Sequence, residues 1–153
     1  MARELNSGFS IMEYDRLRQL QRDLFRRFKY EYDEKQWGTP EYWEDYAHLK
    51  PAIDEGKSWV SDCEGYALVA MHTLMNLGFK CRLVFCTVGG EGHAICEVVS
   101  KDMKEAFYFD NRYDLLMSRE GLKGYKFYSV SPWNPQPGDR RPWLLVAQHD
   151  KEV

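Results

Sequence analysis

The stretch that decides the fold is SDCEGYALVAMHTLMNLGF, residues 61–79. Asp62 is a favoured N-cap, and the residues after it are apolar around most of a helix surface, which is typical of a buried helix. Gly78 stands where a helix commonly ends in a left-handed residue. We therefore predict a buried central helix in which Cys63 occupies the first turn.

Two further helices are predicted before this one. Ser10 and Glu13 have the spacing of a capping box, and apolar residues at helical intervals follow, so we expect a helix over about residues 11–32. A second helix is predicted over residues 39–50, because Thr, Pro and Glu begin it and a proline follows it. Residues 54–61 are predicted to form a polar loop.

Beyond the central helix the hydrophobic pattern changes from a helical to a strand period. A glycine-rich segment, residues 89–92, predicts a turn between the first two strands. Helices that precede strands in this way indicate an α+β fold with the helices packed on an antiparallel sheet. The predicted strands cover residues 81–88, 93–99, 106–110, 125–130 and 143–147.

Composition narrows the class of protein. The chain has 153 residues, 44% hydrophobic and 29% charged, so we expect one globular domain over residues 1–153. A net charge of −3 with scattered Lys and Arg gives no basis for nucleic-acid binding. No apolar run is long enough for a membrane span or a signal peptide, so we expect no membrane partner and a cytoplasmic or unknown location. Four cysteines do not make a disulfide scaffold.

One cysteine stands out as a candidate nucleophile. Only a thiolate attacks carbonyl groups well, and the positive end of a helix dipole or a nearby imidazolium favours that form. Cys63 alone lies at a predicted helix start, between two acids, Asp62 and Glu64. The other three cysteines lie in predicted strands, where we expect small buried apolar residues, and their spacing fits no common zinc site.

A histidine and an aspartate complete the constellation. His93 begins one predicted strand and Asp110 ends the next, so the two strands form a hairpin. If Val98 pairs with Glu105, His93 lies opposite Asp110, and a register shift of two leaves them diagonal neighbours on one face. An acid beside an imidazole fixes its tautomer and stabilises the imidazolium.

These residues lie in segments that match a known family in order and spacing. Together they resemble the transglutaminase-like cysteine proteinases of bacteria, over roughly residues 37–111. The matching segments are SDCEGYA at 61–67, GHAI at 92–95 and FDN at 109–111, with WGTPE at 37–41 and LGFKCRLV at 77–84.

The resemblance implies a papain-like, transglutaminase-like fold and a Cys63–His93–Asp110 triad that cleaves a peptide bond in a protein or peptide substrate. No cofactor is required for that reaction. In the best-known members the acids beside the nucleophile bind calcium, which makes Asp62 and Glu64 candidate ligands. The family run usually has a second acid where this chain has Gly65.

Three alternatives remain open at the level of sequence. A lysine or another amine in place of water would make the enzyme a transamidase, because both reactions use the same acyl-enzyme. The fold could instead serve as a non-catalytic binding or assembly module, or the Cys and His residues could bind a metal. For an enzyme, the backbone N–H of Cys63 is one oxyanion donor, and the indole N–H of Trp37 or Trp59 is the candidate for the second.

Overall fold

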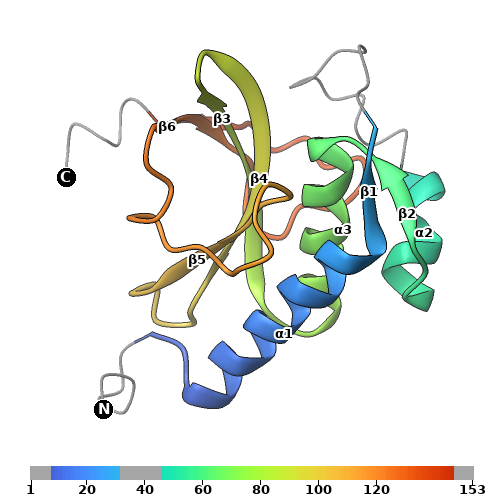
Figure 1. Ribbon diagram of the computed structural model, residues 1–153. Coiled ribbons are helices and arrows are strands. Elements are labelled where there is room, and N and C mark those ends of the chain that lie inside the picture. Colours follow the sequence, from blue (N-terminus) through green and yellow to red (C-terminus); the bar gives the residue numbers. More distant parts are fainter. Residues whose placement is uncertain (1–7, 32–45, 147–153) are drawn as a thin grey trace.

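The computed structural model describes residues 8–31 and 46–146 and has the predicted α+β class (Figure 1). Its helices are α1 (Ile11–Arg27), α2 (Tyr46–Glu55) and α3 (Cys63–Asn76). Its strands are β1 (Phe28–Tyr30), β2 (Trp59–Ser61), β3 (Lys80–Val88), β4 (Glu91–Val99), β5 (Ala106–Phe109), β6 (Tyr125–Val130) and β7 (Leu144–Leu145). None of the helices in the described ranges is long and apolar enough to cross a bilayer.

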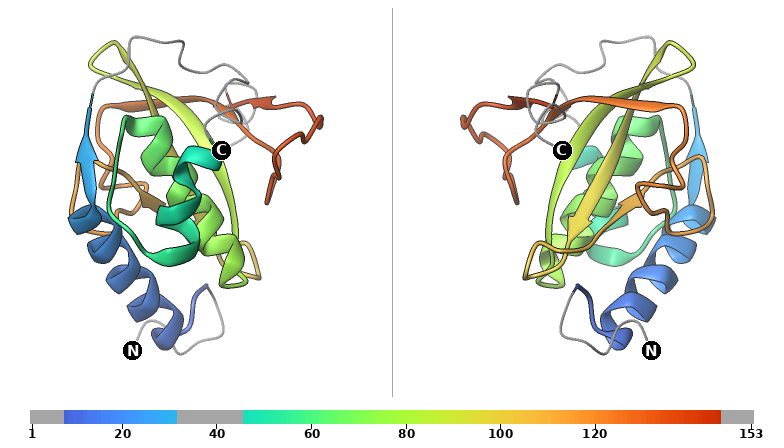
Figure 2. Two further views of the ribbon diagram at one scale, coloured as in Figure 1. Left: turned by 90° about the vertical axis from the view of Figure 1, so that its right-hand side faces the viewer. Right: turned by 90° about the vertical axis from the view of Figure 1, so that its left-hand side faces the viewer.

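Five of the strands form one antiparallel sheet in the order β5-β4-β3-β6-β7. The β3–β4 hairpin turns at Gly89 and Gly90, whose φ angles of 60° and 83° favour glycine. The helices gather on one side of this sheet, and α3 lies between the sheet and α2 (Figures 1 and 2). The predicted packing of a central helix on an antiparallel sheet is confirmed.

The core explains why α3 is apolar on nearly every side. Its side chains from Tyr66 to Leu74 are buried between the sheet and α2, with the exception of Thr73. A second apolar cluster covers the other face of the sheet and includes Val84, Ile95 and Tyr125. Cys81, Cys86 and Cys96 are fully buried in these clusters, as the strand pattern predicts. Burial of apolar side chains in these two clusters is the main stabilising contribution in a chain of this size.

The first helix is shorter than predicted. It ends at Arg27, and β1 then pairs in parallel with β2, which lies in the segment predicted to be a loop. Phe28 packs against Trp59 and Tyr66, with ring centroids 5.3 and 4.9 Å away. These long-range aromatic contacts override the helical periodicity of the local sequence.

The second helix does not end before Pro51. Pro51 lies inside α2, and its carbonyl accepts a hydrogen bond from the backbone N–H of Lys57 at 3.3 Å. A proline inside a helix removes one backbone hydrogen bond. Burial of Leu49, Ala52 and Ile53 offsets that cost. The predicted start of this helix lies outside the described residues.

The predicted hairpin register is wrong by two residues. Val98 pairs with Phe107 rather than with Glu105, and the last pair is Cys96 with Phe109. One residue beyond the last pair, Asp110 would lie opposite Ile95. His93 is two residues from Ile95 on the same strand, so it is the diagonal neighbour of Asp110. A shift of two keeps both side chains on the same face, because the side-chain period of a strand is two.

Stability should fall in mild acid because of His72 on α3. This side chain is buried with its ring edge against Tyr46, and burial lowers its pKa to about 4 from 6.5. Protons therefore bind preferentially to the unfolded chain, and stability that is fully present above pH 6.5 is lost progressively toward pH 4. Urea denaturation at several pH values should show this loss, and His72→Gln should lack most of it. Equal losses in both proteins would contradict the assignment.

Candidate functional site

Cys63 is the first residue of α3, and the local sequence holds it there. The backbone of Asp62 is extended, and its Oδ1 accepts a hydrogen bond from the N–H of Gly65 at 3.1 Å, as the N-cap prediction requires. A Cβ on Gly65 would lie 1.8 Å from Oγ of Ser61, so only glycine fits where β2 runs into α3. Asp62 and Gly65 together fix the start of the helix beneath the thiol.

His93 and Asp110 are joined by a hydrogen bond. Nε2 of His93 lies 2.8 Å from Oδ1 of Asp110. The aspartate is fully buried and the histidine is 7% exposed. The same Oδ1 accepts from the backbone N–H of Arg112 at 3.0 Å, and Oδ2 accepts from the hydroxyl of Tyr125. Three donors thus satisfy a carboxylate that water does not reach.

Helix α1 supports the backbone of this acid. Gln21 is fully buried, and its Nε2 donates to the carbonyl oxygens of Asp110 at 3.0 Å and Tyr113 at 2.6 Å. Its Oε1 accepts from the hydroxyl of Tyr66 on α3 at 2.6 Å. One side chain therefore connects α1, α3 and the loop that follows β5.

The sulfur of Cys63 lies against strand β4 beside His93. It accepts a hydrogen bond from the backbone N–H of Ala94, the residue that follows His93. Strand β5 pairs with β4 only from Cys96 onward, so it does not cover the edge of β4 at this point. The start of α3 thus meets the start of β4 at the residue next to His93, and the charge of Asp110 acts on the thiol.

Electrostatics keep the thiol protonated. Burial raises the pKa of Cys63 to about 12, and the negative charges of Asp62, Glu64 and Asp110 act in the same direction. The hydrogen bond from Ala94 opposes them but does not outweigh them. A cysteine with this pKa is a neutral thiol near pH 7, and only with a base that removes its proton could it act as a nucleophile.

Of the two tryptophans predicted as oxyanion donors, the structure describes one. Trp37 lies outside the described residues. Trp59 is buried in an aromatic cluster, stacked on Tyr66 at 5.9 Å with the guanidinium of Arg27 5.5 Å from its ring centre. Its Nε1 is buried and has no hydrogen-bond partner in the described part of the chain.

The predicted calcium ligands are not brought into a metal-binding group by the described residues. Within residues 8–31 and 46–146, no three His, Cys, Asp or Glu side chains gather closely enough to hold a metal ion. Asp62 already serves as the N-cap, and Gly65, where the family run has its second acid, has no space for a side chain. Calcium binding at Asp62 and Glu64 therefore stays a prediction.

Sequence reasoning missed the residues that surround the acid. Arg112 follows Asp110 by two positions, but nothing in its spacing tied it to the acid. Tyr125 begins a predicted strand, and nothing in its position indicates a contact with the acid. Gln21 falls on the apolar face of a predicted helix, where a polar residue is the one signal of a buried polar contact. Their contacts to Asp110 span 15 and 89 positions, so no local pattern reports them.

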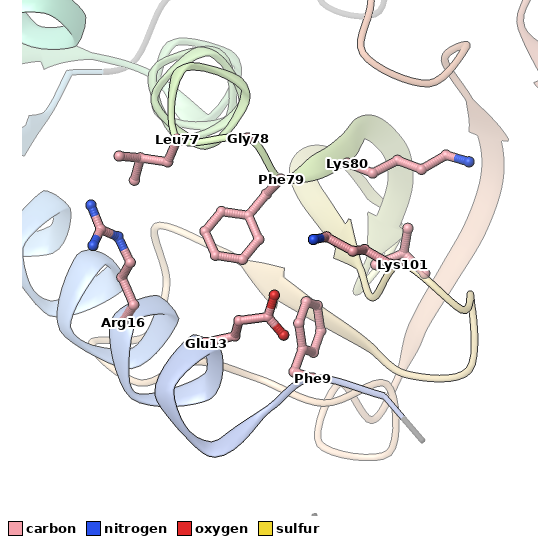
Figure 3. A pocket seen from close by; sticks show the side chains of 9 residues that line it. Phe9, Glu13, Arg16, Leu77, Gly78, Phe79, Lys80 and Lys101 are labelled. Carbon is pink, nitrogen blue, oxygen red and sulfur yellow. The ribbon is translucent and has the colours of Figure 1, made fainter. Parts of the chain in front are cut away.

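A separate pocket of about 500 Å³ lies at the other end of α3, next to Leu77 and Gly78. Figure 3 shows the ring of Phe79 within it, with Glu13 and Arg16 of α1 alongside. Helix α3 has 14 residues, so it separates this pocket from Cys63 by roughly 20 Å. The pocket is therefore distinct from the candidate site.

The fold is similar to solved structures, although the sequence matches no family model and no curated protein. Calcium-bound LapG of Legionella pneumophila matches with a TM-score of 0.57 and 16% identity, over 87% of this chain and 74% of that one. A second LapG structure from the same organism has a TM-score of 0.56 and 16% identity, over 90% of this chain and 76% of that one. The EGTA-treated form has a TM-score of 0.52 and 18% identity, over 77% of this chain and 67% of that one. The chain has the papain-like, transglutaminase-like α+β fold.

Neutralising Asp62 should make Cys63 more reactive. Asp62→Asn keeps a good N-cap but removes one of the charges that raise the thiol pKa. We expect the pH profile of Cys63 alkylation by iodoacetamide, followed by peptide mass spectrometry, to move to lower pH. The rate at pH 8 should rise about threefold, the size expected for one partly screened charge.

Glu55→Gln is the control for this experiment, because this exposed acid is not among the charges that raise the thiol pKa, and it should leave the profile unchanged. Asp62→Ala removes both the charge and the cap, so it should also cost about 1 kcal/mol of unfolding free energy. An unchanged profile in Asp62→Asn would show that burial alone sets the reactivity of the thiol.

Proposed function

We propose that this protein is a cysteine hydrolase that cleaves an amide bond in a protein or peptide substrate. Cys63 is the nucleophile, His93 the base and Asp110 the residue that orients the histidine. The observation that carries the proposal is a thiol at a helix start, hydrogen-bonded to the residue beside a buried His–Asp pair. The transglutaminase-like fold and the sequence resemblance support the same reaction.

The reaction proceeds through a thioester. The sulfur of Cys63 attacks the amide carbonyl carbon while its proton passes to His93. The imidazolium then gives this proton to the leaving amine as the C–N bond breaks. Water attacks the thioester with His93 again as base, and the acid product and the free thiol are released.

The arrangement favours proton transfer during attack over a resting thiolate–imidazolium pair. The pKa of Cys63 is raised to about 12, so the thiol is neutral before substrate binds. Nε2 of His93 is engaged by Asp110, which leaves Nδ1 to take the proton. Asp110 then stabilises the imidazolium that forms.

The oxyanion of the tetrahedral intermediate needs donors near the start of α3. The backbone N–H of Cys63 is suitable, because the first N–H groups of a helix have no partner within the helix. Trp59 is a candidate for the second donor, since its indole N–H is buried and has no partner among residues 8–31 and 46–146. Trp37 is the other candidate.

We further propose that the domain spans residues 1–153 and that the reaction uses no cofactor. Calcium enters no step of this proposal, and Asp62 and Glu64 stay the candidate ligands should the protein bind it. Transamidation remains the alternative outcome of the same acyl-enzyme. A fluorescent primary amine added with a peptide substrate separates the two, since a transamidase would attach the amine to the substrate and a hydrolase would release the free acid.

Substitutions in the triad should stop acylation. Cys63→Ala should abolish formation of an acyl-enzyme from p-nitrophenyl acetate, followed by intact-protein mass spectrometry. His93→Ala should slow it by about 10²- to 10⁴-fold, the range for loss of a general base. Asp110→Asn should also slow it strongly, because an amide in place of the carboxylate favours the wrong histidine tautomer.

Cys86→Ala is the matched control, because this thiol is also buried, also has a raised pKa and lies opposite His93 on β3. It should retain acylation at Cys63. Acylation that persists at another residue in Cys63→Ala would reject Cys63 as the nucleophile. A wild-type protein that is never acylated by esters or peptides would favour a non-catalytic binding module on this fold.

A further inference from the structure

Asp110 poses a physical problem that one histidine does not solve. A carboxylate with no exposed surface is costly unless donors satisfy both of its oxygens. Oδ1 receives the N–H groups of His93 and Arg112. The hydroxyl of Tyr125 is the donor that the structure gives to Oδ2. Loss of this hydroxyl would leave a buried, charged oxygen without a partner.

The register of the sheet explains how a residue on β6 reaches this acid. His93 pairs with Cys86 on β3, and Tyr125 pairs with Val88, two residues further along the same strand. Positions that pair or differ by two share a face of the sheet. The ring of Tyr125 therefore lies beside the imidazole, at 5.9 Å between centroids and an interplanar angle of 70°.

Arg112 fixes the direction in which the Tyr125 hydroxyl donates. Its Nη1 lies 3.2 Å from the hydroxyl oxygen, and a guanidinium can only donate. The hydroxyl accepts from Arg112 and donates its own hydrogen to Asp110, because a carboxylate can only accept. Burial and this hydrogen bond raise the pKa of Tyr125, so the hydroxyl keeps its hydrogen at neutral pH.

We propose that Tyr125 is a positioning residue of the site, which holds Asp110 oriented toward His93, with Arg112 donating to its hydroxyl. This inference rests on the proposed function of Cys63, His93 and Asp110. Tyr125 touches neither the thiol nor the substrate in the proposed reaction. It acts through the acid, by binding the oxygen that His93 leaves unoccupied, and through ring contact that limits rotation of the imidazole.

The test compares two tyrosines with the same chemistry. Tyr108 is buried on β5, and its hydroxyl donates to Oε2 of the buried Glu97 at 2.6 Å, a bond of the same kind on another acid. Tyr125→Phe should lower kcat for p-nitrophenyl acetate by about 10- to 100-fold, as for loss of a residue that supports a reacting group, with KM little changed. Tyr108→Phe should retain wild-type kcat.

Arg112→Ala refines the comparison. It removes the guanidinium but keeps the backbone N–H that binds Asp110, so the fall in kcat should be smaller than in Tyr125→Phe. Thermal unfolding of all three variants shows whether stability accounts for the kinetics. Equal kcat in Tyr125→Phe and Tyr108→Phe at similar melting temperature would overturn the proposal.

A second readout separates this inference from the proposed function. The ¹⁵N NMR signals of the His93 ring report which nitrogen carries the proton and how strongly it is hydrogen-bonded. Tyr125→Phe should change these signals and their pH dependence, and Tyr108→Phe should not. If the wild type is inactive but this change occurs, the proposed function fails and the role of Tyr125 in holding the pair stands. If the signals are the same in both variants, the role of Tyr125 fails whatever the activity.

Discussion

The rest of the site depends on one buried negative charge. Asp110 has no exposed surface, and burial of its carboxylate is costly unless donors converge on it. Those donors come from β4, from β6 and from the loop after β5, while Gln21 of α1 holds the backbone of the acid. Residues far apart in the chain thus meet at this carboxylate. Helix α1 and strands β4 and β6 are therefore packed so that these side chains reach Asp110.

The surroundings of Cys63 have opposing effects on the pKa of its thiol. The start of α3 and the N–H of Ala94 favour a thiolate, whereas burial and three neighbouring acids oppose it and prevail. In the proposed reaction, the His93–Asp110 pair therefore supplies the driving force for deprotonation. A reactive thiolate would be exposed to oxidation and alkylation at all times. A neutral thiol that loses its proton only during attack avoids this in the resting protein.

The likeness to LapG structures concerns the course of the chain, at 16–18% identity. The similar structures include calcium-bound and EGTA-treated forms of LapG. Ser61 packs where a side chain at position 65 would project, and Asp62 is used as a helix cap. A shared fold does not by itself establish a ligand site, because such a site depends on a few side chains that the fold does not require.

The sequence by itself determined the α+β class, the start and end of the central helix, and the main strands, because capping and hydrophobic periodicity are local signals. It also singled out Cys63, His93 and Asp110 as candidates by their places on these elements. Only the tertiary structure decided the hairpin register, the end of α1, the strand pair β1–β2 and the surroundings of the acid. These depend on aromatic packing and on hydrogen bonds between residues as far apart as Gln21 and Asp110. No periodicity along the chain encodes such contacts, since they are set by which surfaces meet when the helices pack on the sheet.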